Sequence, residues 1–402
     1  MRLKQVFLPS LNWDYRNHTR KFRSTMDFGF SENQEMLRTV AKDFLTKECP
    51  KAVVRKLDKD EKGYDPKIWS DMAELGWQGL VLPEEYGGTC ADFVDLTVLM
   101  EEMGRNILPA PFFSTVALCS LPLLEYGTKA QKDKYLPTIA NGEAIWSLAL
   151  LEKSASYRPS QLNLQAQKVG DDYILKGDKI FVQDAKIANY LLVAARTGKS
   201  KDAKKGITLF IVDAKTPGIK LELIPTMAGD RQFHINFNKV KIPADNILGT
   251  VDEGWEIVDF ILQRAAVLKS AEMSGACQAV LDMTNIYVKE RVQFDKPIGS
   301  FQLIQRKMTR MVINVDAVKF LLYQAAWEIS TGKASQLHIS MVKSKAAEAY
   351  QKICIDGIAN HGAIGFTQDH DIGLYYRRVR AAEFAAGNTD FHKELIAVGI
   401  GL

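Results

Sequence analysis

The sequence contains little cysteine and no long apolar run. Its 402 residues include five scattered cysteines, with no C-x-x-C spacing: Cys49, Cys90, Cys119, Cys277 and Cys354. An odd, scattered set argues against a disulfide framework and a zinc site, so we expect no metal and a cytoplasmic location. No apolar run is long enough to cross a bilayer, so we expect no membrane contact.

A strong excess of one charge is also missing. The formal net charge is +4 and the isoelectric point is about 8.6, which is too mild to favour a nucleic-acid partner. Hydrophobic residues make up 47% and charged residues 25% of the chain. This composition is typical of a globular protein of two or three domains.

The first 25 residues are poor in acid, with six basic side chains and only Asp14 to balance them. Such a composition can indicate a targeting peptide, but the stretch contains Pro9 and lacks an amphipathic period. We interpret residues 1–25 as a flexible extension or a misassigned start before Met26, and an organelle signal is the alternative.

The remaining chain changes its hydrophobic period twice. Residues 26–146 predict a helical domain that begins at a capping box, Ser31 to Gln34. Residues 147–250 predict a β domain, because Phe233, Ile235 and Phe237 alternate with polar residues. Residues 251–402 predict a helical bundle. Helices, strands and helices in separate segments indicate an α+β protein.

The segment between Glu290 and Gln302 interrupts two long helical patterns. It brings together a cation, an aromatic ring and an amide: Arg291, Phe294 and Gln302. Arginine can grip a pyrophosphate with paired hydrogen bonds, and an aromatic ring can pack on an adenine. From spacing alone, an ordinary turn between helices explains the segment better than a binding site does.

Several motifs in one order resemble the acyl-CoA dehydrogenase family. The segment above resembles its R-x-x-F-x-x-x-I-x-x-x-Q hairpin, which contacts the adenosine-diphosphate half of FAD. Further similar stretches are LPEEYGG from Leu82, EEMGRNILPAPF from Glu101, DRQFHINFNKVKIP from Asp230 and ANHGAIGFTQDHDIGLYYRR from Ala359. The resemblance covers the chain from about Met26 to its end.

The resemblance implies a fold, a reaction and partners. The fold is an N-terminal helical domain, a middle β-barrel or sandwich and a C-terminal four-helix bundle. The reaction is α,β-dehydrogenation of an acyl-CoA thioester with FAD as hydride acceptor, in which a carboxylate removes the α-proton. An electron-transfer flavoprotein is the implied acceptor, and the implied assembly is a homo- or hetero-oligomer, either a dimer or a tetramer.

The usual catalytic base is missing at both family positions. Where the family carries a Glu before a glycine, this sequence has Ala386, and the alternative position on the first bundle helix is Ala265. The catalytic residue is therefore unknown. Candidate replacement carboxylates, each of which can equally be an ordinary solvated side chain, are Asp92, Asp95, Glu152, Glu383 and Asp390.

The predicted cofactor contacts divide into two groups. On the flavin-ring side the aromatic Phe181 is kept, Gln183 replaces a family Thr, and the glycine-rich loop has become Leu151 to Arg158. On the adenine side the sequence retains most of the family residues: Arg291, Phe294, Gln302, His361 and Gly362. The family places the adenine half of each FAD against a neighbouring subunit.

Three interpretations stay open. The chain is a base-deficient subunit of a heteromeric enzyme, an active homomeric enzyme with a relocated base, or a flavin-free pseudoenzyme. Lys269 and Glu272, three apart near the family's active-site helix, predict a surface ion pair.

Overall fold

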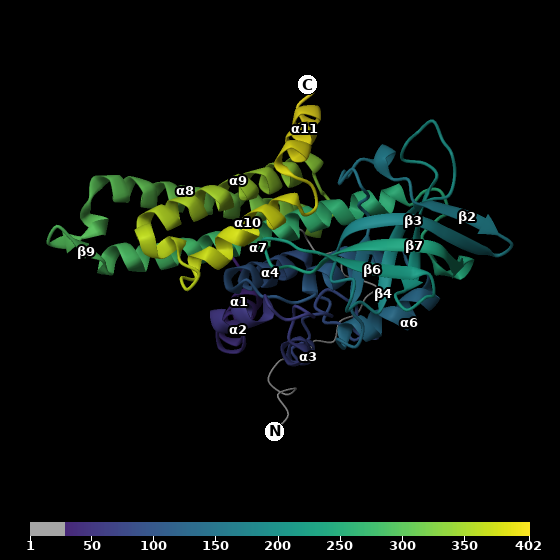
Figure 1. Ribbon diagram of the computed structural model, residues 1–402, viewed down its shortest axis with the longest axis horizontal. Coiled ribbons are helices and arrows are strands. Elements are labelled where there is room, and N and C mark those ends of the chain that lie inside the picture. Colours follow the sequence, from purple (N-terminus) through teal and green to yellow (C-terminus); the bar gives the residue numbers. More distant parts are fainter. Residues whose placement is uncertain (1–28) are drawn as a thin grey trace.

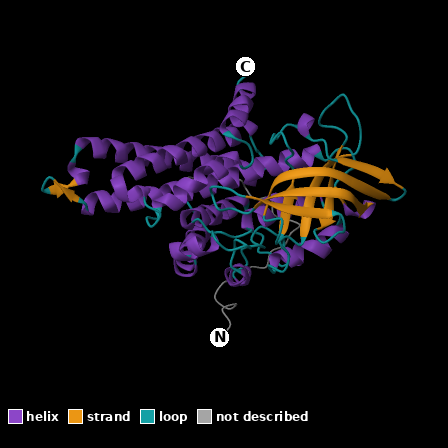
Figure 2. Cartoon of the chain, in the orientation of Figure 1, coloured by secondary structure: helices purple, strands orange, loops and turns teal. Residues whose placement is uncertain are grey.

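The computed structural model describes residues 29–402, and the predicted extension 1–25 lies outside them. Helices occupy both ends of the described chain and strands the middle (Figures 1 and 2). The predicted α+β order is therefore confirmed.

The N-terminal region packs short helices around a buried face. Its capping box is present, since the Ser31 hydroxyl accepts from Gln34 N and the Gln34 amide accepts from Ser31 N. A π-helix, Phe113–Ser120, leads into the last two helices. The α-helices are α1 (Glu32–Glu48), α2 (Lys51–Leu57), α3 (Pro66–Glu74), α4 (Phe93–Asn106), α5 (Leu121–Tyr126) and α6 (Lys129–Ala140).

The middle region is one curled sheet of eight strands. Its order is β6-β7-β3-β2-β4-β5-β8, with β1 paired in parallel to β4. The predicted alternation is correct, because Phe233, Ile235 and Phe237 are buried in the core of the sheet. The strands are β1 (Trp146–Ala149), β2 (Gln165–Val169), β3 (Asp172–Gln183), β4 (Tyr190–Arg196), β5 (Ile207–Asp213), β6 (Ile219–Ile224), β7 (Gln232–Pro243) and β8 (Ile247–Leu248).

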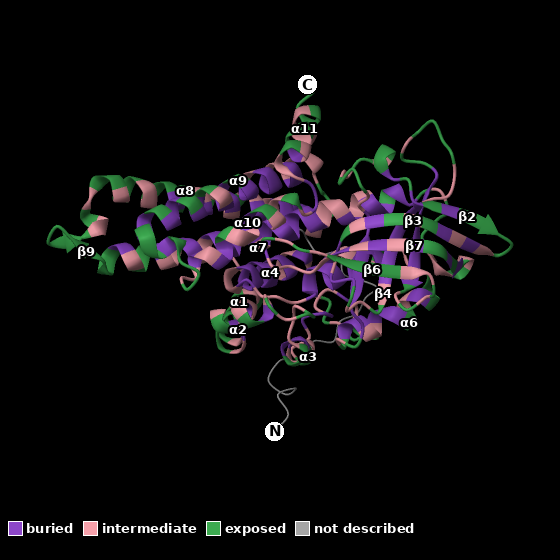
Figure 3. Cartoon of the chain, viewed as in Figure 1, coloured by how far each residue is buried: buried purple, intermediate pink, exposed green. Residues whose placement is uncertain are grey.

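The C-terminal region is a bundle of long helices, as predicted. Its helices are α7 (Trp255–Glu290), α8 (Gln302–Ser330), α9 (Gln336–His361), α10 (Ile372–Phe384) and α11 (Thr389–Gly399). One apolar stripe of α8 is buried and consists of Met311, Val315, Val318 and Leu322. The opposite face of α8 is exposed in many places (Figure 3). No described helix is both long and apolar enough to cross a membrane.

Helices α4 and α7 cross at two glycines. A Cβ atom added at Gly275 would lie 1.8 Å from the carbonyl oxygen of Glu101, and one added at Gly104 would lie 2.0 Å from that of Glu272. Real Cβ atoms do not approach backbone this closely. The absence of a side chain at both positions therefore sets the distance between the two helices.

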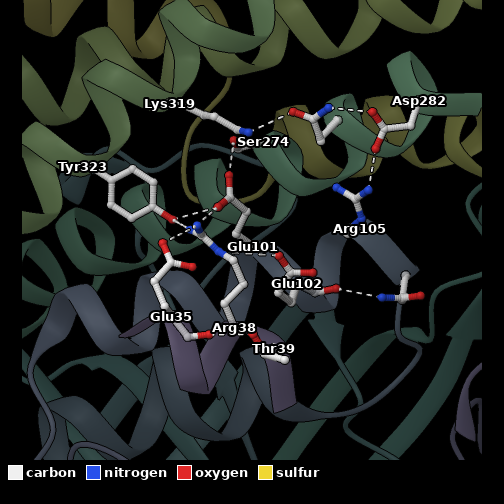
Figure 4. Close-up of polar contacts among 12 residues, drawn as sticks. Glu35, Arg38, Thr39, Glu101, Glu102, Arg105, Ser274, Asp282, Lys319 and Tyr323 are labelled. Carbon is white, nitrogen blue, oxygen red and sulfur yellow. Dashed lines mark hydrogen bonds and ion pairs between the residues drawn. The ribbon is translucent and has the colours of Figure 1, made fainter. Parts of the chain in front are cut away.

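A buried carboxylate fixes the same crossing. Glu101 is 4% exposed, and its Oε1 accepts from the Ser274 hydroxyl at 2.7 Å. Its Oε2 accepts from the Tyr323 hydroxyl at 2.7 Å and from Arg38 at 3.3 Å (Figure 4). A buried charge is tolerated only when it is paired and hydrogen-bonded, so Glu101 links α1, α4, α7 and α8 through satisfied partners.

We predict that Gly275→Ala lowers the free energy of unfolding by about 3 kcal/mol, because backbone must move to admit the methyl group. Gly373→Ala is the matched control. Its added Cβ would meet nothing closer than 3.6 Å, so we expect a change below about 1 kcal/mol. Chemical denaturation followed by circular dichroism measures both variants. Equal stabilities for the two would contradict this account of the crossing.

Candidate active site

A large cavity separates the β3 end of the sheet from the turn between α10 and α11. Its volume is about 860 Å³, within the range of ligand-binding pockets. We call it the ring cavity. Four of the predicted site positions border it: Phe181, Gln183, Ala386 and Asp390. The structure thus brings the flavin-ring predictions together with the position of the missing base.

Ala386 lies in a tightly held loop. Its φ is +56°, an unfavourable value for a residue with a side chain, and it is 6% exposed. The Tyr157 hydroxyl accepts from Ala386 N at 3.1 Å and donates to the carbonyl of Phe384 at 3.2 Å. Burial raises the pKa of Tyr157 to about 12, so this hydroxyl stays protonated and can donate.

Two further side chains hold the loop from the bundle side. The ammonium of Lys343 donates to the carbonyl oxygens of Glu383 at 2.7 Å and Gly387 at 2.8 Å. The ring of His392 bonds the carbonyl of Ala386 through Nε2 at 2.9 Å. Burial, followed by the charge of Lys343, lowers the pKa of His392 to about 4, so this ring is neutral. The backbone on both sides of Ala386 is therefore fixed.

The second family position for a base is closed to solvent. Ala265 is fully buried in α7, within the core formed with α4 and the other bundle helices. Neither Ala265 nor Ala386 can accept a proton.

Two candidate carboxylates serve as helix caps. Asp92 Oδ1 accepts from the backbone N–H groups of Val94 at 2.8 Å and Asp95 at 3.0 Å. Asp95 Oδ2 accepts from Asp92 N at 2.8 Å. Both carboxylates belong to the start of α4, and neither borders the ring cavity.

Glu152 is bound within the β domain. Its Oε1 accepts from the fully buried ammonium of Lys179 at 2.8 Å and from Leu164 N at 2.9 Å. Burial, opposed by the Glu152 charge, lowers the pKa of Lys179 to about 8. The carboxylate is needed to satisfy this lysine.

Of the two remaining candidates, only Asp390 borders the ring cavity. Glu383 Oε2 pairs with Arg380, and its Oε1 accepts from the Thr389 hydroxyl at 3.1 Å.

Asp230, at the ring cavity, and Asp184, at a smaller cavity beside it, were not among the predicted carboxylates. Asp230 borders the ring cavity, and Gln232 Nε2 donates to its Oδ2 at 2.7 Å. Asp184 is 9% exposed and accepts from the Ser114 hydroxyl at 2.6 Å. Burial raises the pKa of Asp184 to about 6, against the opposing effect of the Ser114 hydrogen bond. The sequence signal that could have identified Asp184 is its position directly after Gln183, a predicted cofactor contact.

The predicted adenine-side hairpin projects from the far end of the bundle. Arg291 follows the end of α7, and Gln302 begins α8, with the short strands β9 (Val292–Gln293) and β10 (Lys296–Pro297) between them. Phe294, at the turn, is 86% exposed. Among the described residues the Arg291 side chain has no hydrogen-bond or ion-pair partner, so it is available to a ligand.

His361 is the last residue of α9, and it is 3% exposed. Its ring stacks on Tyr287 at 4.5 Å between centroids, and Nδ1 bonds the carbonyl of Gly357 at 2.8 Å. Burial lowers the pKa of the ring, and Nε2 is buried with no partner among the described residues. Gly362, next in the chain, has φ +66° and open space around it.

The two predicted groups lie at opposite ends of the bundle (Figure 1). Leu262 of α7 borders the ring cavity, and Arg291 follows it by 29 residues, or about 44 Å of helix. One chain therefore does not bring its own ring cavity and hairpin together.

Backbone strain, seen as positive φ at residues other than glycine, concentrates at the cavities and at the hairpin turn. Ten described residues other than glycine have positive φ. Seven of them border a cavity or form the hairpin turn: Ile107, Ala155, Phe181, Asp184, Phe294, Asp295 and Ala386. Strain of this kind persists at sites where the surrounding structure enforces it, and it often marks function.

The buried lysine beside the Ala386 loop gives a pH prediction. Burial, reinforced by the charge of Lys269, lowers the pKa of Lys343 from 10.5 to about 7. Between these values the unfolded chain binds more protons, so this group makes the free energy of unfolding rise with pH from about 7 to about 10. We predict that Lys343→Met removes this rise, measured by denaturation at several pH values.

Lys201→Met removes an exposed ammonium and is the control, for which we expect the wild-type pH profile. If Lys343→Met kept the wild-type dependence of the free energy of unfolding on pH, the assignment of this rise to Lys343 would be contradicted.

Comparison with known proteins agrees with this geometry. Three family models match in order: the acyl-CoA dehydrogenase N-terminal domain at residues 31–143, the middle domain at 147–240 and the C-terminal domain at 252–401. Among the residues that the structure describes, no group of His, Cys, Asp and Glu could hold a metal ion.

Individual relatives align over nearly the whole chain. The 3-(aryl)acrylate reductase of Clostridium sporogenes is 34% identical, covering 92% of this chain and 98% of the relative. The mitochondrial isovaleryl-CoA dehydrogenase of Pongo abelii is 32% identical, and the alignment covers 92% of this chain and 88% of the relative. The structure of butyryl-CoA dehydrogenase from Megasphaera elsdenii superimposes with a TM-score of 0.87 at 28% identity. The superposition covers 93% of this chain and 100% of that structure's chain. The chain belongs to the acyl-CoA dehydrogenase family.

Proposed function

We propose that this chain is an acyl-CoA dehydrogenase-type subunit that lacks the usual carboxylate base and works with a second, different subunit. Ala386 carries the proposal, because it borders the ring cavity in a loop that is held on both sides but offers no proton acceptor. The family consists of FAD-dependent oxidoreductases, and FAD supplies the hydride acceptor when bound.

The residues present fit FAD in two separate halves. At the ring cavity, Phe181 offers an aromatic face, and the buried Gln232 Oε1 has no partner among the described residues. At the far end, His361 Nε2 is likewise unpaired, and Arg291 can bind a pyrophosphate. A buried polar atom without a partner is costly, so both ends favour a polar ligand.

The separation of the halves supports a partner subunit. Because the hairpin lies about 44 Å of helix from the ring cavity, it can serve only a flavin held by another chain. In this proposal Arg291, Phe294 and Gln302 contact the partner's FAD, and the partner supplies the base that this chain lacks.

The names of relatives suggest the substrate and the electron acceptor. One relative, 31% identical over 92% of this chain, is the caffeyl-CoA reductase-Etf complex subunit CarC of Acetobacterium woodii. We infer an acyl-CoA thioester as substrate and an electron-transfer flavoprotein as redox partner.

One observation favours the alternative of an active homomeric enzyme. Asp390 borders the ring cavity and could act as a relocated base. The third interpretation, a flavin-free pseudoenzyme, is excluded if the purified protein absorbs in the flavin bands.

We predict that Ala386→Glu raises acyl-CoA oxidation by the purified chain at least about 100-fold, because it restores a general base at the cavity. Ala386→Gln has the same length without basicity and should stay at the wild-type background. The assay follows reduction of an artificial electron acceptor with FAD present and no partner added.

Robust turnover by the wild-type chain alone would contradict the proposal. If Asp390→Asn then abolished that turnover, the relocated-base enzyme would be the correct interpretation.

A further inference from the structure

A second, smaller cavity opens beside the ring cavity. Its volume is about 140 Å³, and it lies between α4, α7 and the ends of β3 and β7. We call it the tail cavity. The two cavities share part of their walls, including Phe113, Gln183, Asp230 and Gln232. A ligand whose reacting end occupies the ring cavity can therefore extend into the tail cavity.

The tail cavity has the size of a ring, and its wall is partly apolar and partly polar. The apolar part of the wall includes Met100 and Met103 of α4, Ala276 of α7, and Phe112 just before the π-helix. A cavity of about 150 Å³ with apolar walls is known to hold one benzene. A compact six-membered ring therefore fits this space better than a long alkyl chain.

One basic and one acidic side chain in the wall are nine-tenths buried. Lys269, predicted on the surface, is in fact 6% exposed, because α4 and Phe113 cover it. Its ammonium donates to Glu272 Oε2 at 2.6 Å and lies 3.9 Å from the centre of the Phe113 ring. An ammonium has three donors, and among the described residues only Glu272 accepts one. The other buried group is Asp184, which accepts from Ser114.

The other cationic side chains at this cavity already have hydrogen-bond or ion-pair partners. Arg231 donates to backbone carbonyl oxygens, including that of Asp60 at 3.1 Å, and Arg378 pairs with Asp58. Lys269 and Asp184 thus remain as a donor and an acceptor that a ligand in the cavity could engage.

We propose that the tail cavity receives the far end of the acyl group, and that Lys269 and Asp184 select a ring-sized tail with a neutral hydrogen-bonding group, such as a hydroxyl. This inference rests on the proposed function, because it places the thioester in the ring cavity. A hydroxyl can accept from Lys269 and donate to Asp184. An anionic tail would meet the carboxylates of Asp184 and Glu272, and a hydrocarbon tail would cover buried polar groups without pairing them.

The test measures binding rather than turnover. Isothermal titration calorimetry on the FAD-loaded protein, with any chain that copurifies, compares the CoA thioesters of phenylpropanoic acid, its para-hydroxylated form and adipic acid. We expect the hydroxylated thioester to bind at least about tenfold more tightly than the other two. Lys269→Met and the nearly isosteric Asp184→Asn should each reduce this preference. Lys67→Met, which breaks an exposed ion pair with Asp71, should preserve it.

Equal binding of the three thioesters, or an unchanged preference in both cavity variants, would overturn the tail assignment while leaving thioester binding intact. If no thioester bound more tightly than free CoA, the proposed function itself would fail.

Discussion

The close crossing of α4 and α7 is the constraint on which the site depends. Gly104 and Gly275 let the two backbones touch, and Glu101 ties the crossing to α1 and α8. Glu272, whose carbonyl meets Gly104, lies one helical turn from Lys269 and borders the tail cavity. A side chain at either glycine would separate the helices and change the shape of that cavity. Bundle stability and acyl-group selection therefore rest on the same contact.

The ring cavity combines well-defined geometry with an absent reactive group. Ala386 keeps a strained backbone, and Tyr157, Lys343 and His392 hold the loop around it. A loop fixed this firmly places any side chain at position 386 against the cavity. Alanine there is compatible with a chain that has lost proton abstraction but still shapes a site and offers a hairpin to a neighbour.

Local patterns in the sequence predicted the fold well. The break between Glu290 and Gln302 was predicted correctly, because helix boundaries follow from local sequence. The burial of Lys269 was predicted wrongly, because it depends on α4, which is distant in sequence. Asp184 and Asp230 were missed for the same reason, since a carboxylate is recognised as part of a cavity only after the chain has folded.

The central claim is that this chain holds a thioester beside a cavity without a base. It is tested most directly by α-proton exchange, in which the purified FAD-loaded chain is incubated with an acyl-CoA in deuterated water. Mass spectrometry of the recovered thioester then counts deuterium at the α-carbon. The account predicts no incorporation above the buffer rate for the wild-type chain and clear incorporation for Ala386→Glu. Rapid incorporation by the wild-type chain alone would contradict it.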